Sequence, residues 1–147
     1  SVYNGLVAAS GTVEADDWVL VHDAARPCLP QDDLSNLLRE GGKDAVGAIL
    51  ALPVAETVKS GASDENGVER IAATQDRTRL WLAQTPQMFR AGLLAQALGR
   101  TGVVTDEASA VEQLGLKPRL VVGSRENLKV TYPEDVRIAA AILAMRA

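Results

Sequence analysis

A short hydrophobic run that stops abruptly at charged residues constrains the fold of this chain more than any other feature. The run Trp18-Val19-Leu20-Val21 is followed by His22-Asp23-Ala24-Ala25-Arg26-Pro27. A stretch rich in Val and Leu is typical of a strand buried on both faces. Open α/β sheets bind ligands outside the carboxyl ends of their strands. The sequence therefore predicts that Asp23 and Arg26 lie together at a ligand-binding rim.

Downstream of this run, apolar periodicity alternates between the strand and the helix pattern. Strands are expected over residues 17–22, 45–52, 118–122 and 128–131, and helices over 1–9, 31–39, 91–98, 105–115 and 133–145. Ser1 and Thr105 are the expected caps of the first and fourth of these helices. Strands interleaved with helices imply one α/β domain over residues 1–147, with a mostly parallel sheet flanked by helices.

The segment 53–76 departs from this alternation. Residues 54–59 and 68–73 have apolar residues at roughly every second position, and the turn-rich stretch 60–67 separates them. This pattern predicts a protruding β-hairpin arm. Because an isolated two-stranded ribbon is marginal in water, we expect the arm to pack on a second subunit.

Composition limits the classes of function. A chain of 147 residues has the size of one domain, and its net charge of −4 argues against general nucleic-acid binding. No apolar run reaches about 18 residues, and no leader pattern is present, so a cytoplasmic protein that inserts in no membrane is expected. The single cysteine, Cys28, fits a reducing compartment, and we interpret it as a small buried side chain.

Four segments carry a family resemblance: Val19–Pro27, Leu80–Phe89, Thr105–Glu112 and Asn127–Asp135. In order and spacing they resemble the 2-C-methyl-D-erythritol 4-phosphate cytidylyltransferases. The resemblance implies a Rossmann-like fold of the nucleotide-diphospho-sugar transferase type. It also implies transfer of a cytidylyl group from CTP to methylerythritol phosphate with release of pyrophosphate, a step of non-mevalonate isoprenoid biosynthesis.

The resemblance implies roles for nine residues of this chain. Asp23 and Lys129 match the catalytic pair. Five residues match contacts to the polyol phosphate: Arg26, Thr57, Arg77, Thr85 and Thr105. Two residues, Ser1 and Ala24, match contacts to the nucleotide. A magnesium ion, bound mainly by nucleotide phosphates, is implied near Asp23. The arm is implied to form a homodimer and to bring Thr57 and Arg77 to the partner's substrate.

The chain departs from the family pattern at its start. A loop of the type Ala-Ala-Gly-x-Gly-x-Arg-x and a downstream Pro-Lys, which hold the triphosphate in the family, do not occur in the sequence. The chain also opens on an expected helix without an initiator Met. We therefore expect a fragment that lacks N-terminal strands and is inactive alone.

Other interpretations of these residues stay open. A related enzyme acting on ribitol 5-phosphate or a similar polyol phosphate fits the same scaffold, and so does a noncatalytic α/β association module. Asp23 can simply cap a turn and pair with Arg26, and Lys129 can be a solvated lysine. The remaining structural interpretations are Thr105 as a helix cap, His22 as a strand-end hydrogen-bonding residue, and Trp81 and Phe89 as core or interface residues.

Overall fold

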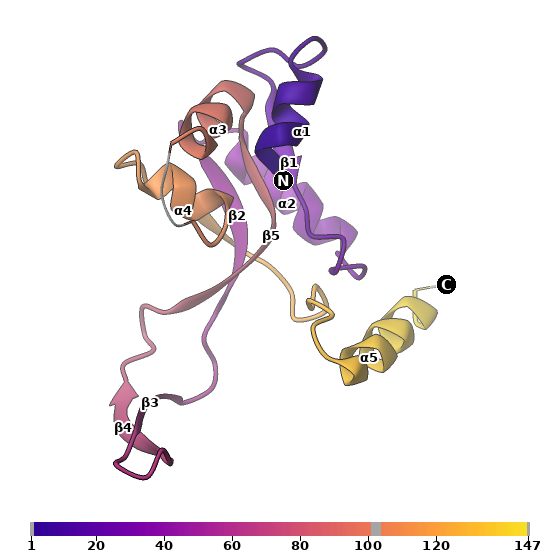
Figure 1. The fold of residues 1–147 in the computed structure, drawn as a ribbon. Helices are drawn as coiled ribbons and strands as arrows, with labels where there is room; N and C mark the ends of the chain where they lie inside the picture. The colour runs from indigo at the N-terminus through magenta and orange to yellow at the C-terminus, as the bar shows by residue number, and fades with distance from the viewer. Residues whose placement is uncertain (1, 101–103, 147) are drawn as a thin grey trace.

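The computed structural model describes residues 2–100 and 104–146, and a four-stranded mixed sheet forms its centre (Figure 1). The sheet contains β1 (Trp18–Val21), β2 (Gly47–Pro53), β5 (Trp81–Arg90) and β6 (Arg119–Val122), in the spatial order β1-β5-β2-β6. Strand β2 pairs in parallel with β6, whereas β5 is antiparallel to both β1 and β2. Three strands therefore run in one direction, as expected for a mostly parallel sheet, and β5 runs against them.

The hairpin arm explains the direction of β5. The chain leaves β2 at Pro53 and returns at Trp81, which faces Pro53 across the sheet. Between these points β3 (Val58–Ser63) and β4 (Glu69–Gln75) form a separate antiparallel pair that projects from the body (Figure 1). Because the chain turns back in this hairpin, it re-enters the sheet antiparallel to β2, the strand that it left. The predicted arm is confirmed.

The arm turn is tighter than the sequence suggested. The Asp64 carboxylate accepts hydrogen bonds from the backbone N–H groups of Asn66 and Val68, at 2.9 and 3.0 Å. Gly67 adopts φ +75°, a conformation that glycine reaches without steric cost. The turn therefore spans only the residues around Asp64, and β3 continues to Ser63 instead of ending at residue 59 as expected.

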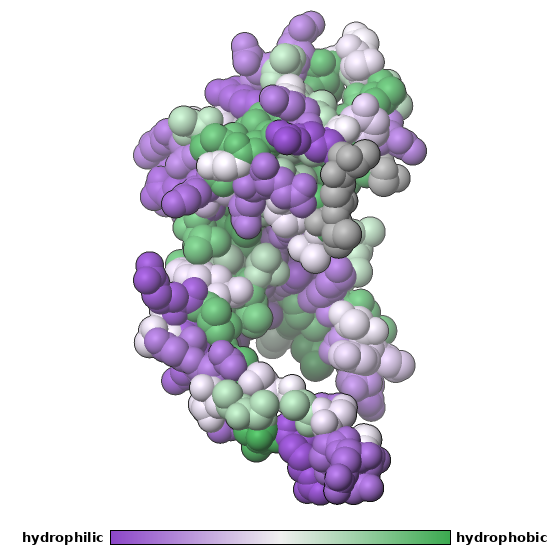
Figure 2. Space-filling view, turned by 60° about the vertical axis from the view of Figure 1, so that its left-hand side comes forward, coloured by the Kyte–Doolittle hydropathy of each residue, from purple (hydrophilic) through white to green (hydrophobic). Residues whose placement is uncertain are grey.

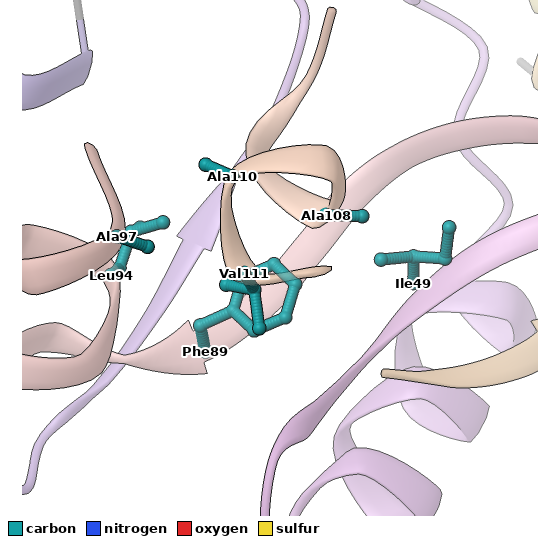
Figure 3. Packing of buried hydrophobic residues seen from close by; sticks show 7 residues of the cluster. All are labelled: Ile49, Phe89, Leu94, Ala97, Ala108, Ala110 and Val111. Atoms are coloured by element: carbon teal, nitrogen blue, oxygen red, sulfur yellow. The ribbon is translucent and has the colours of Figure 1, made fainter. Parts of the chain in front are cut away.

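Alternating side chains of the sheet build a core on each face. On one face Ile49 and Phe89 pack with Leu94 and Val111, from α3 (Ala91–Leu98) and α4 (Glu107–Glu112) (Figure 3). Helix α1 (Val2–Ala9) adds partly buried side chains to this cluster. On the other face Leu37, from α2 (Gln31–Gly41), packs against buried residues of the sheet: Ala48, Leu50, Met88 and Val121. Strands β2 and β5 thus have buried side chains on both faces.

Two local expectations are wrong. Helix α4 is capped by Asp106 rather than Thr105, because the Asp106 carboxylate accepts the Ser109 N–H at 2.9 Å and completes a capping box. Residues 128–131 form no strand. They make a single backbone hydrogen bond to the segment after β1, from Val130 N to Ala25 O at 2.8 Å, and one bond cannot start a ladder.

The last helix, α5 (Pro133–Ala144), packs against the segment that follows β1. Its Ala139 is buried, and the Ala139 carbonyl lies 3.5 Å from Cys28 Sγ. Cys28 is fully buried, which confirms its interpretation as a small core residue. Across residues 2–100 and 104–146, no helix combines the length and the apolar character that crossing a membrane requires.

Gly47 offers a direct test of the packing between β2 and β5. At φ +122° an added Cβ would lie 2.3 Å from the Met88 carbonyl oxygen and 2.7 Å from Phe89 Cδ1. We expect Gly47→Ala to lower the free energy of unfolding by about 2–3 kcal/mol, since strain and overpacking add. Gly67→Ala is the control, because its φ is +75° but nothing lies within 4 Å of the added Cβ. Equal losses in urea titrations of the two variants would contradict the packing argument.

Candidate active site

A polar pocket of about 370 Å³ lies beside the carboxyl end of β1. Asp23 and Arg26 reach it from the segment after β1, Thr85 from β5, Thr105 from the approach to α4, and Lys129 from the segment between β6 and α5. The sequence expectation that these five residues meet in one cavity is confirmed. The other lining residues are Ala83, Gln84, Gln87, Asp106 and Glu107.

Asp23 joins the two cations of the pocket. Its Oδ2 lies 3.1 Å from Lys129 Nζ and 3.5 Å from Arg26 Nε. The Arg26 side chain is 11% exposed, whereas that of Lys129 is 52% exposed. Burial lowers the pKa of the Arg26 guanidinium and attraction by Asp23 opposes this, but an arginine keeps its charge at any physiological pH. Lys129 is therefore the cation that a ligand can reach.

Arg26 also fixes the segment that carries Lys129. Its Nη1 donates to the carbonyl oxygen of Asn127 at 2.7 Å. The buried Asn127 side chain donates to the Thr85 carbonyl at 2.8 Å, and Gln84 Nε2 donates to the Ser124 carbonyl at 3.0 Å. Neither Gln84 nor Asn127 is predicted from the sequence, because the partners of a buried amide depend on the fold. Their only signal is their place inside the motif segments.

His22 links two residues that line the pocket, Arg26 and Thr85. Its Nε2 lies 3.1 Å from the Arg26 carbonyl oxygen, and its Nδ1 lies 3.0 Å from Thr85 Oγ1. The same hydroxyl oxygen accepts the backbone N–H of Asp23 at 2.9 Å. The interpretation of His22 as a strand-end hydrogen-bonding residue is confirmed.

The opposite wall is the beginning of α4. Gln87 Nε2 donates to Asp106 Oδ2 at 2.8 Å, and Gln87 Oε1 accepts the backbone N–H of Ala108 at 2.8 Å. A fully buried glutamine of β5 thus fixes where α4 begins. Glu107 follows, and burial raises its pKa, with nearby Asp106 and Asp23 adding to the rise. Sequence reasoning did not single out Gln87, Asp106 or Glu107 as pocket residues.

The raised pKa of Glu107 predicts a pH-dependent cost to stability. When the folded pKa of an acid is above its unfolded value, stability falls as pH rises through that window and stays low above it. We expect Glu107→Gln to be more stable than the parent at pH 8 by a few tenths of a kcal/mol. Its advantage should shrink as pH falls through the raised folded pKa toward the ordinary value near 4.5, and should be absent below that value. Urea titrations at pH 4 and pH 8 measure the difference, and an advantage that grew on acidification would contradict it.

Three residues with expected roles, Thr57, Arg77 and Ala24, are not among the residues that line this pocket. Thr57 and Arg77 are exposed and stand on either side of the β3–β4 pair, at the base of the arm. Ala24 lines a separate apolar pocket, together with Pro27, Val130 and residues of α5. Ser1 lies outside the described residues.

The metal-binding and aromatic residues of the described chain give little sign of a preformed metal site or of a base-stacking surface. Within residues 2–100 and 104–146, no three His, Cys, Asp or Glu side chains are grouped so that they could hold a metal ion. Phe89 is fully buried, which confirms it as a core residue, whereas Trp81 is 38% exposed at the base of the arm. The carboxylates that line the pocket, Asp23, Asp106 and Glu107, are the oxygen donors available to a cation brought in with a ligand.

Solved structures share this fold. A crystal structure of 4-diphosphocytidyl-2C-methyl-D-erythritol synthase superposes with a TM-score of 0.86 at 47% identity, covering 97% of this chain and 65% of that one. The 2-C-methyl-D-erythritol 4-phosphate cytidylyltransferase of Francisella tularensis gives 0.81 at 37% identity, covering 97% of this chain and 66% of that one. The predicted nucleotidyltransferase α/β fold is confirmed.

Sequence comparison extends the similarity to curated relatives. Two proteins named 2-C-methyl-D-erythritol 4-phosphate cytidylyltransferase, from Dechloromonas aromatica and Thiobacillus denitrificans, are 56% and 54% identical over 146 and 144 residues. These alignments cover 99% and 97% of this chain, which spans 62% of the length of each relative. The family model of the same description matches residues 1–145. The chain therefore belongs to the family of 2-C-methyl-D-erythritol 4-phosphate cytidylyltransferases.

Proposed function

We propose that the protein containing this chain joins CTP and 2-C-methyl-D-erythritol 4-phosphate to give 4-diphosphocytidyl-2-C-methyl-D-erythritol and pyrophosphate. One observation carries the proposal: Asp23 and Lys129, which belong to distant segments, meet at 3.1 Å in a pocket that Thr85 and Thr105 also line. A noncatalytic association module gives no reason for a carboxylate, an accessible amine and two hydroxyl residues to share one cavity.

The chemistry needs little from the protein beyond positioning and charge. An anionic oxygen of the polyol phosphate attacks the α-phosphorus of CTP, the new P–O bond forms, and the bond to the pyrophosphate oxygen breaks. Negative charge grows on the non-bridging oxygens, and fixed cations lower its energy. Lys129 is the catalytic cation of this proposal, and Asp23 is the carboxylate that orients the polyol. Arg26 holds both in place and contributes its own positive charge.

The nucleotide side of the proposal involves Ser1, Ala24 and magnesium. Ala24 follows Asp23 and has no side chain beyond Cβ, which leaves room for a ribose, and Ser1 is proposed to contact the cytidine. Mg²⁺ favours oxygen ligands and is commonly held by substrate phosphates with one or two carboxylates. Asp23 is the proposed nearest carboxylate. The ion would neutralise the leaving pyrophosphate.

The arm is proposed to form a homodimer. Large apolar side chains are exposed along it and at its base: Val68, Ile71, Leu80, Trp81 and Leu82. Figure 2 shows that the tip at the bottom of the molecule is hydrophilic, with apolar residues next to it. Exposed apolar groups of this kind favour a protein contact. In this arrangement Thr57 and Arg77, which do not line the pocket of their own chain, contact the phosphate bound by the partner.

Mixing two inactive variants of the full-length protein tests the crossed arrangement. Arg77→Ala removes the donated residue and Asp23→Ala removes the receiving one. We expect random exchange to give about half mixed dimers, each with one intact site, and so to recover about a quarter of wild-type activity. Pyrophosphate release before and after mixing measures the recovery. No recovery, in a sample where mass spectrometry of the intact dimer shows exchange, would contradict the crossed arm.

The activity itself is tested with the full-length protein, CTP and two acceptors. Pyrophosphate release should be fast with methylerythritol phosphate and slow with ribitol 5-phosphate. The reverse order would favour the related polyol-phosphate enzyme, and release with neither acceptor would reject the proposal. Residues 1–147 alone are expected to release none, because the triphosphate loop expected from the family is not among them.

A further inference from the structure

The mechanism proposed above gives no role to His22, which hydrogen-bonds residues that line the pocket. His22 follows β1 directly and makes two hydrogen bonds, one through each ring nitrogen. Its partners are the carbonyl of Arg26 and the hydroxyl of Thr85, so it contacts two residues that line the pocket. A residue that contacts neither the cavity nor the reacting atoms can act only through these neighbours.

The two bonds select one tautomer of the imidazole. A carbonyl oxygen only accepts, so the 3.1 Å contact requires a hydrogen on His22 Nε2. In the neutral ring the other nitrogen, Nδ1, then carries no hydrogen and accepts. Its partner at 3.0 Å is Thr85 Oγ1, so the Thr85 hydroxyl must donate to the ring.

The Thr85 hydroxyl is thereby left with an acceptor function only. Its single hydrogen is directed to His22, and one of its lone pairs accepts the Asp23 N–H at 2.9 Å. Thr85 lines the pocket, so a ligand that reaches its hydroxyl meets an acceptor and no donor. The Asp23 carboxylate, next to it, also accepts only. This part of the wall matches ligand groups that donate hydrogen bonds, and a fully ionised phosphate has none to donate.

We infer that His22 is a positioning residue that turns the Thr85 hydroxyl into an acceptor, so that Thr85 binds a hydroxyl group of the polyol and not its phosphate. The inference rests on the proposed function for the identity of the polyol phosphate. It changes the expected role of Thr85 from phosphate contact to hydroxyl contact. The phosphate then lies toward Lys129, whose amine carries three donors and is half exposed.

The tautomer is measured without any assay of activity. In full-length protein labelled with ¹⁵N-histidine, at alkaline pH, the His22 signal is identified as the one lost in His22→Gln. The chain holds one histidine, so any further histidine signal comes from outside it. We expect Nε2 to have the shift of a protonated nitrogen and Nδ1 that of an unprotonated one. The opposite tautomer, or an even mixture, would overturn the inference.

Two substitutions of His22 separate the two hydrogen bonds. In His22→Asn the amide oxygen takes the place of Nδ1 and still accepts from Thr85. In His22→Gln the amide reaches the Arg26 carbonyl and leaves the Thr85 hydroxyl free to rotate. We expect His22→Gln to raise the KM for the polyol phosphate about tenfold, the value of one hydrogen bond, and His22→Asn to stay within about threefold of wild type. If His22 served only to hold the Arg26 turn, the order of the two variants would reverse.

Thr85→Val decides which part of the ligand the hydroxyl contacts. We expect its KM for the polyol phosphate to rise about tenfold, while the inhibition constant of inorganic phosphate, measured in competition with that substrate, stays within about twofold. A parallel rise in both constants would show that Thr85 donates to phosphate and would overturn the inference. A wild-type protein that is inactive with any polyol phosphate rejects the proposed function instead, and the nitrogen shifts then still test the tautomer.

Discussion

Lys129→Ala in the full-length protein should lower kcat/KM for the polyol phosphate by about 100- to 1,000-fold, the usual effect of losing one charged group that stabilises a transition state. The Lys129 amine lies 3.1 Å from Asp23 and its side chain is 52% exposed, so a bound phosphate can take over the contact. An exposed ion pair adds at most about 1 kcal/mol to stability. The loss of activity should therefore occur with almost no change in Tm.

The measurement is the initial rate of pyrophosphate release, together with a thermal melt of the same sample. Lys43→Ala is the matched control, because Lys43 is an exposed lysine outside the pocket residues. It should leave the rate unchanged. A loss below tenfold in Lys129→Ala would remove Lys129 from the catalytic role.

Phe89→Ala should produce the largest loss of stability, about 3–5 kcal/mol. Phe89 is fully buried and belongs to the cluster that holds α3 and α4 on β5. Removing the ring leaves a cavity beside Leu94 and Val111, which are themselves fully buried and have no freedom to fill it. For a domain of this size the Tm should fall by roughly 10 °C.

Phe89→Leu is the comparison, because it retains most of the apolar volume and should lose clearly less stability. Urea unfolding followed by circular dichroism gives both values. Equal losses in the two variants would show that the cavity is not the cause. Since α4 begins at the pocket, the affinity for the polyol phosphate should fall with stability in Phe89→Ala.

The parts of the fold that can be predicted from the sequence are those marked by a pattern in their own residues. The helix α2 has an apolar stripe and ends at Gly41-Gly42, and the rim after β1 is marked by the change from Val21 to Asp23. The reversed direction of β5 has no such signal, because it follows from the return of the arm and not from the composition of the strand. The direction of a strand within a sheet is a property of its neighbours.

The same distinction applies to the pocket. Asp23 and Arg26 are predicted because charged residues follow an apolar segment there, whereas Lys129 is predicted through the family resemblance alone. The supports of the pocket were missed: for Asn127 and Gln87, no sequence pattern separates a buried, hydrogen-bonded amide from an exposed one. Residues 128–131 show the effect of such supports. Their apolar and polar residues alternate as in a strand, but the hydrogen bonds of the preceding Asn127 hold this segment as a loop.

Pro53 and Trp81 pair on neighbouring strands of the sheet, and this pairing affects which changes in arm length the family can tolerate. Both ends of the arm leave from one rung of the ladder, so insertions or deletions between them alter neither the register of the sheet nor the spacing of the pocket walls. The reach of the arm can therefore vary without moving the pocket residues of its own chain. In the homodimer proposed above, changes in the length of this segment can alter how tightly the two subunits associate while the pocket residues of each chain keep their places.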